Sequence, residues 1–174
     1  MALAICKTDG GRRSSGYTCE KKDCTVRSFA LAADVPYDVA HDVARRSGRK
    51  NHKGWWSEKI LTEARADGLV DFVPVPVGAQ NVQRYHHWHG FITKIQYPTV
   101  ETVVRRHRKG RYVMSTRNHA FAVIDGVIHD TGVRPRARVV SIFEVRPIES
   151  PKPVPCTQEQ VSELWARLDR LEAK

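Results

Sequence analysis

The feature that most constrains the fold is a change in hydrophobic pattern along the chain, from helical spacing to strand spacing. In the first half, apolar residues fall on one face of a helix in residues 24–33, 36–46 and 58–66. In the second half, short runs are rich in β-branched and aromatic residues at 112–116, 119–124, 127–130 and 139–145. This order predicts an α+β fold, with N-terminal helices packed on a C-terminal antiparallel sheet.

A tight turn sets the register of two of the predicted strands. Asp125-Gly126 is a preferred two-residue hairpin turn. Counting back from this turn pairs Phe121 with Asp130. Because alternate residues of a strand share a face, His119 and Asp130 are expected on the same side of the sheet, as diagonal neighbours.

A cysteine stands where a polar loop is predicted to turn into the first helix. Cys24 follows Asp23, a candidate N-cap residue. The helix dipole favours a thiolate at this position. His119 can hold that thiolate as an ion pair and protonate a leaving group, and Asp130 can orient the imidazole. A single cysteine here is more often a small buried residue, but the combination predicts a catalytic Cys24-His119-Asp130 triad.

The residues around this triad resemble papain-like cysteine peptidases, in the small form found in bacteriophage proteins. Residues 23–30 (Asp-Cys-Thr-Val-Arg-Ser-Phe-Ala) are similar to the family's nucleophile helix. Residues 109–116, 118–120 and 125–130 are similar to its histidine and acid strands. The resemblance implies a phage-encoded thiol hydrolase that cleaves a peptide, isopeptide or related acyl bond in a protein or peptide substrate. It implies no metal and no cofactor, and a place in the host cytoplasm or within the virion.

One position departs from the family pattern. Papain-like enzymes usually have a glutamine shortly before the cysteine to help hold the oxyanion, and Thr18 occupies that position here. The resemblance then implies an oxyanion hole made by the backbone N–H of Cys24 with Thr18 or another loop group. Losing one such donor typically costs about 10²–10³ in rate, so a catalytically degenerate version of the fold is an alternative.

The chain is strongly basic, with 29 Lys and Arg against 19 Asp and Glu and a formal net charge of +10. Such a charge suits nucleic acid, an acidic partner or a solvated surface, without choosing among them. Two basic runs, the first next to Trp55 and Trp56, supply candidate nucleic-acid-binding residues. These are Arg45, Arg46, Arg49, Lys50 and Lys53, then Arg105, Arg106, Arg108 and Lys109, with Arg134, Arg136 and Arg138 adding further charge. A basic module that binds nucleic acid or a host protein is therefore the alternative function.

The cysteines favour free thiols in a reducing cytoplasm. They are Cys6, Cys19, Cys24 and Cys156. They are too few for a secreted disulfide scaffold, and the first residues lack the pattern of a signal peptide. A zinc site built from the first three cysteines and the histidines of residues 86–89 is a weaker alternative, because the spacings match no standard finger.

The chain is expected to form one catalytic domain, residues 1–147, with a C-terminal appendage. Residues 148–156 are rich in proline and are interpreted as a linker. Residues 157–174 are predicted to form an amphipathic helix, which either docks on its own domain or makes a homodimer. No apolar run approaches the roughly 18 residues that a membrane span needs. Residues 78–97 support no prediction.

Overall fold

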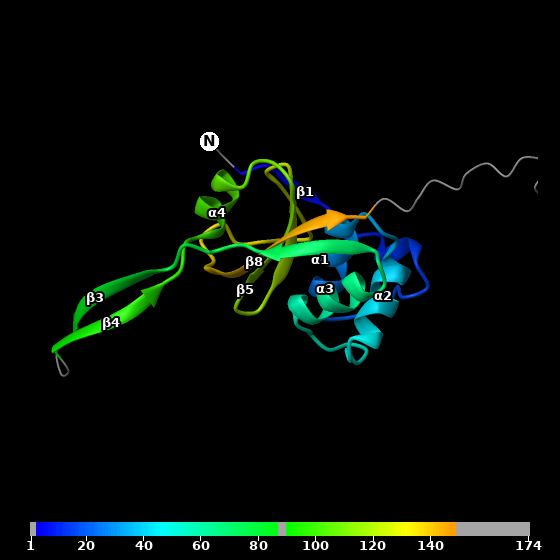
Figure 1. Ribbon diagram of the computed structural model, residues 1–174, viewed down its shortest axis with the longest axis horizontal. Helices are drawn as coiled ribbons and strands as arrows, with labels where there is room; N and C mark the ends of the chain where they lie inside the picture. The colour runs from blue at the N-terminus through cyan, green and yellow to red at the C-terminus, as the bar shows by residue number, and fades with distance from the viewer. Residues whose placement is uncertain (1–2, 87–89, 149–174) are drawn as a thin grey trace, which may run out of the picture.

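The computed structural model describes residues 3–86 and 90–148. Within these residues, four α-helices, a six-stranded sheet and a separate two-stranded hairpin make a mixed α+β fold (Figure 1). Almost all of the predicted linker and the whole predicted helix 157–174 lie outside the described residues. None of the helices in the described part is both long and apolar enough to cross a membrane.

The first half of the chain forms the predicted helices within about one residue. They are α1 (Cys24–Ala33), α2 (Tyr37–Arg46) and α3 (Ser57–Ala66). Asp34 ends α1 in the left-handed conformation, with φ 59°, and its N–H donates to the Ala30 carbonyl. Pro36 then stands at the N-cap of α2 and presets the backbone for the new helix. This short break turns the chain back, so that α2 packs against α1.

The large sheet has the strand order β1-β7-β6-β5-β8-β2. Its strands are β1 (Ile5–Lys7), β2 (Val70–Pro74), β5 (Arg111–Thr116), β6 (Ala120–Ile124), β7 (Val127–Asp130) and β8 (Val139–Pro147). The four C-terminal strands are antiparallel, as predicted. The sheet extends beyond these four predicted strands at both edges, and its pairing is parallel at one of them. Strand β1 pairs with β7 in parallel, and β2 pairs with β8.

The predicted hairpin turn is confirmed. Asp125 and Gly126 both have left-handed backbone, with φ 48° and 77°, the combination that a type I′ turn requires. The register pairs Ile124 with Val127 and Ala122 with His129. This register places the start of β6 beside the end of β7.

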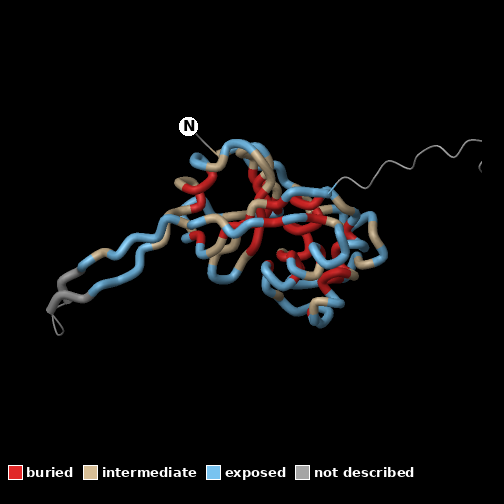
Figure 2. Tube along the Cα trace, viewed as in Figure 1, coloured by how far each residue is buried: buried red, intermediate tan, exposed pale blue. Residues whose placement is uncertain are grey.

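Helices cover both faces of the sheet, and buried residues fill the space between the layers (Figure 2). On one face, α1 packs against β5, β6, β7 and β8. On the other face, α4 (Val100–Arg106) contributes Val100, Val103 and Val104 to a second apolar cluster. The Thr99 side chain accepts the Thr102 N–H and so caps α4.

Residues 80–86 and 90–96, part of the stretch with no sequence prediction, form a projecting pair of strands that we call the arm. It consists of β3 (Gln80–His86) and β4 (Gly90–Gln96), paired from Gln80–Gln96 to His86–Gly90. The arm extends away from the sheet and helices (Figure 1). Its described side chains are exposed or only partly buried (Figure 2), so packing on the core does not explain its presence.

Candidate active site

The structure brings the three predicted catalytic residues together from three elements. Cys24 is the first residue of α1, His119 directly precedes β6, and Asp130 is the last residue of β7. Helix α1 packs on β6 and β7, and β6 and β7 are joined by the tight turn. The sequence order and the turn chemistry therefore position the histidine and the carboxylate beside the N-terminus of the nucleophile helix.

His119 is held by a short contact with Asp130. The distance from His119 Nε2 to Asp130 Oδ2 is 2.7 Å, and the carboxylate is 3% exposed. The same carboxylate oxygen accepts the Gly132 N–H at 3.0 Å. Hydrogen bonds with Asp130 and with the Cys24 thiol raise the pKa of His119 to about 9. Because Nε2 faces Asp130, Nδ1 is the ring nitrogen that remains for the thiol.

Opposing effects act on the pKa of the Cys24 thiol, and the net result is a lowered value. Burial alone would raise the pKa of Cys24. Hydrogen bonds from His119 and from the Ala120 N–H outweigh the burial and lower it. Since the pKa of His119 is raised and that of Cys24 is lowered, the pair titrates as a unit with a thiolate–imidazolium form between the two limits.

Cys24 and His119 open into a cleft of about 590 Å³. Its walls come from the N-terminus of α1, residues 54–58, residues 115–120 and strand β8. Trp56 is 71% exposed on one wall. The loop beside it is anchored, because Thr25 Oγ1 donates to the Trp55 carbonyl at 3.0 Å. The thiol is thus reachable from solvent through a cleft large enough for an extended peptide segment or a small acyl group.

The prediction that Thr18 supplies an oxyanion donor receives no support from the geometry. Thr18 is exposed, its hydroxyl lies 3.9 Å from Cys19 Sγ, and it is not among the cleft-lining residues. The Cys24 N–H is the better donor: as the first residue of α1, it has no acceptor within the helix. Asn118 lines the same cleft and carries an amide donor.

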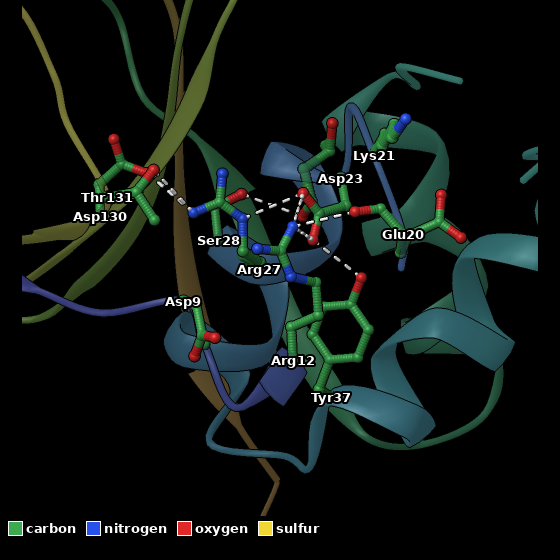
Figure 3. Close-up of polar contacts among 12 residues, drawn as sticks. Asp9, Arg12, Glu20, Lys21, Asp23, Arg27, Ser28, Tyr37, Asp130 and Thr131 are labelled. Atoms are coloured by element: carbon green, nitrogen blue, oxygen red, sulfur yellow. Dashed lines mark hydrogen bonds and ion pairs between the residues drawn. The ribbon is translucent and has the colours of Figure 1, made fainter. Parts of the chain in front are cut away.

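A buried arginine that sequence reasoning missed ties the nucleophile helix to the acid strand (Figure 3). Arg27 lies three residues after Cys24 on α1, and its side chain is 9% exposed. Its Nη1 lies 3.6 Å from Asp130 Oδ1 and donates to Thr131 Oγ1 at 3.1 Å. One sequence signal could have indicated its burial: Arg27 is a charged residue on the face of α1 that packs on the sheet. Arg27 therefore helps to hold the Asp130 carboxylate in place beside His119.

The role predicted for Asp23 is wrong in detail. Asp23 is the N-cap residue of α1, but its side chain makes no capping hydrogen bond. Its carboxylate instead accepts from Tyr37 Oη at 2.9 Å and Arg27 Nε at 3.2 Å, with Arg12 Nη1 at 3.4 Å (Figure 3). Tertiary ion pairing has replaced the local cap, because two guanidinium groups reach this buried carboxylate.

The basic residues of the first run do not form one exposed surface. Arg49 is wrong as a nucleic-acid contact: its side chain is 1% exposed and donates to Glu20 at 2.8 Å. Arg46 is ion-paired with Asp67. Lys50, Lys53 and Arg45 are exposed, as are the four residues of the second run, Arg105, Arg106, Arg108 and Lys109.

The alternative zinc site is not seen among the described residues, in which no group of three His, Cys, Asp or Glu side chains is arranged to hold a metal. Cys6 and Cys19 are free and exposed. The structure does not describe the side chains of the histidines at residues 86–89, nor does it describe Cys156.

The lowered pKa of Cys24 predicts selective alkylation at pH 6. A thiol of ordinary pKa is only about 0.3% ionised at that pH. A Cys24 thiolate held by His119 should therefore react with iodoacetamide roughly 10- to 100-fold faster than Cys19, allowing for the weaker nucleophilicity of a low-pKa thiolate. Peptide mass spectrometry at early times measures both rates. In His119→Ala the advantage should vanish, and equal rates in the unmodified protein would show that no activated pair exists.

A scan against protein-family models, a search of curated proteins and a search of solved structures each found no match to this chain. The candidate site is therefore defined by its own geometry.

Proposed function

We propose that this protein is a thiol-dependent hydrolase with a papain-like catalytic arrangement, which cleaves a peptide, isopeptide or related acyl bond. The observation that carries the proposal is the grouping of Cys24 and His119 at one open cleft, with His119 hydrogen-bonded to the buried Asp130. The thiol at a helix N-terminus and the chain order of the three residues are consistent with the resemblance to papain-like peptidases.

In the first half of the reaction, the Cys24 thiolate attacks the carbonyl carbon of the substrate. A carbon–sulfur bond forms and the carbonyl electron pair moves to oxygen, where the Cys24 N–H at the N-terminus of α1 can stabilise it. The protonated Nδ1 of His119 then gives its proton to the leaving amine or alcohol as the tetrahedral intermediate collapses. The products of this half are a thioester on Cys24 and the released group.

In the second half, neutral His119 accepts a proton from water, and the resulting hydroxide attacks the thioester carbonyl. The carbon–sulfur bond breaks, the carboxylic acid leaves, and the thiolate–imidazolium pair is restored. Asp130 stays hydrogen-bonded to Nε2 throughout, which keeps Nδ1 aimed at the reacting atoms.

The proposal is tested with p-nitrophenyl acetate, a small activated ester that needs no knowledge of the natural substrate. We expect a burst of nitrophenolate and an acetyl group located on Cys24 by mass spectrometry, followed by steady turnover. Cys24→Ala should remove both the burst and the turnover, whereas the matched variant Cys19→Ala should retain them. Acetylation spread evenly over the exposed cysteines, with turnover no faster than for free thiol, would contradict the proposal.

A further inference from the structure

The positive charge of the chain is concentrated in one segment. Residues 75–138 contain eleven Lys and Arg against three Asp and Glu, a net charge of +8 out of +10 for the whole chain. One of the three acidic residues, Asp130, is buried in the candidate active site. The remaining 110 residues are therefore nearly balanced, and the excess charge belongs to the part of the molecule that carries the arm and α4.

The exposed charges of this segment gather where the arm meets the body. Residues 134–138 pack on the start of α4 through the hydrogen bond from the Val100 N–H to the Ala137 carbonyl, 2.9 Å. Arg138 donates to the Tyr97 carbonyl, at the end of the arm, at 2.8 Å. A hollow of about 240 Å³ lies there, lined by residues that include Lys94, Tyr97 and Arg138. We call Lys94, Arg106, Arg134, Arg136 and Arg138 the cationic patch of the arm; all five are exposed.

The arm itself has the chemistry of a surface that reads nucleic-acid bases. No Asp or Glu occurs from residue 77 to residue 98. The described side chains near the body include four exposed amides, with Gln80 and Gln96 on one face of the ribbon and Asn81 and Gln83 on the other. Side-chain amides can make paired hydrogen bonds to the edge of adenine. A two-stranded β-ribbon also fits the roughly 12 Å wide major groove of B-form DNA.

We propose that the arm and its cationic patch bind double-stranded DNA. The ribbon lies in the major groove, and the cationic patch contacts the flanking phosphates. DNA presents one negative charge per roughly 1.7 Å of axis, which suits several cations gathered at the foot of a projecting ribbon. The deep, narrow major groove of duplex RNA excludes such a ribbon. This binding is independent of the proposed hydrolysis, because none of its residues lines the Cys24 cleft.

The test is fluorescence anisotropy of a short labelled DNA duplex, titrated with the full chain over a salt series. The exposed set Lys94, Arg134 and Arg136 is changed to glutamine together. Loss of three phosphate contacts should make the slope of log K against log salt shallower by about 2.7. The matched control changes Arg45, Lys50 and Lys53 to glutamine, removes the same charge elsewhere and should leave the slope unchanged. Thermal unfolding of each variant confirms that it is folded.

Two further variants test how the duplex is bound, and two competing polyanions test whether DNA is the preferred partner. Gln80→Ala with Gln96→Ala, two residues that pair across the ribbon on the face that carries Lys94, should weaken duplex binding without changing the salt slope, because amides contact bases and not phosphates. Cys24→Ala should bind as the unmodified protein does. The proposal is overturned if the two triple variants lose affinity equally, if no duplex binding occurs at low salt, or if duplex RNA or poly-glutamate binds as tightly as DNA.

Discussion

Asp130→Asn is expected to lower Cys24-dependent hydrolysis of p-nitrophenyl acetate by about 10²–10⁴-fold. The amide can still contact His119 Nε2 at the position where the carboxylate lies 2.7 Å away, but it carries no charge to stabilise the imidazolium. If its amide nitrogen faces the ring, Nε2 becomes the hydrogen-bond acceptor and the neutral imidazole carries its proton on Nδ1, so that Nδ1 can no longer accept a proton from the thiol. Geometry is thus nearly preserved while the electrostatics are lost.

The same variant should change the pH profile in a defined direction. The pKa of His119 is raised to about 9, chiefly by Asp130, so the imidazolium form persists up to that pH and is lost above it. Without the carboxylate, this alkaline limit should move toward the ordinary histidine value of about 6.5. The profile of kcat/KM reports the limit directly, because it follows the free enzyme.

His129→Asn serves as the matched control for this pH experiment. His129 is adjacent to Asp130 on β7, and burial and Arg111 lower its pKa. It does not line the cleft. We expect its replacement to leave the alkaline limit near pH 9. An Asp130→Asn profile identical to that of the unmodified protein would rule out Asp130 as the orienting group.

Glu20→Ala should cost about 3–5 kcal/mol of folding free energy, because it leaves a buried guanidinium without its counter-charge. The Glu20 carboxylate is 3% exposed and accepts from Arg49 at 2.8 Å, from the His52 N–H and from His41. Arg49 itself is 1% exposed. For a chain of this size the loss corresponds to a fall in Tm of roughly 6–20 °C. Chemical denaturation and calorimetry measure the two quantities.

Two variants distinguish the cost of leaving a buried charge unpaired from the cost of removing a carboxylate side chain as such. Glu101→Ala removes a surface ion pair with Arg105 and should cost less than about 1 kcal/mol. The double variant Glu20→Ala with Arg49→Met should be more stable than Glu20→Ala alone, since no cation is then left unpaired. If the double variant loses as much folding free energy as Glu20→Ala and Arg49→Met lose when measured singly and added, the pair is not coupled and the explanation is wrong.

Glu20 also makes part of the stability pH-dependent. Burial would raise the pKa of Glu20, but Arg49 and the His52 N–H bring it down to about 2. A depressed folded-state pKa stabilises the protein above the unfolded value of about 4.3, and this contribution disappears as pH falls toward 2. Glu20→Gln should therefore show a flatter stability curve between pH 5 and about 2 than the unmodified protein.

The sequence predicted the parts of the fold that depend on local chemistry. Helix α1 follows from apolar spacing, and the position of Asp130 relative to His119 follows from counting back from the Asp125-Gly126 turn. Strand β1 could not be predicted, because its three residues are exposed and only their pairing with β7 makes them a strand. The arm was also missed, since its register depends on pairing between strands that carry no alternating apolar pattern.

Charged residues were the other source of error. Arg27 and Arg49 look like solvated positions in a basic sequence, yet both side chains are nearly inaccessible. Their burial is decided by carboxylates that the fold supplies from elsewhere, Asp130 in one case and Glu20 in the other. A one-dimensional pattern gives the sign of a charge but not the partner that allows it to be buried.

The placement of the site on distant segments has a consequence for the timing of folding. Helix α1, which begins at Cys24, emerges from the ribosome early, whereas His119 follows Cys24 by 95 residues and Asp130 by 106. Strand β5 lies between β6 and β8, and β8 also pairs with β2, so the sheet closes only when the last strand has been synthesised. Contacts of such long sequence separation form late and slowly. During synthesis Cys24 therefore lacks its His119 partner, and under the proposed function we expect no hydrolytic activity from the nascent chain until its sheet is complete.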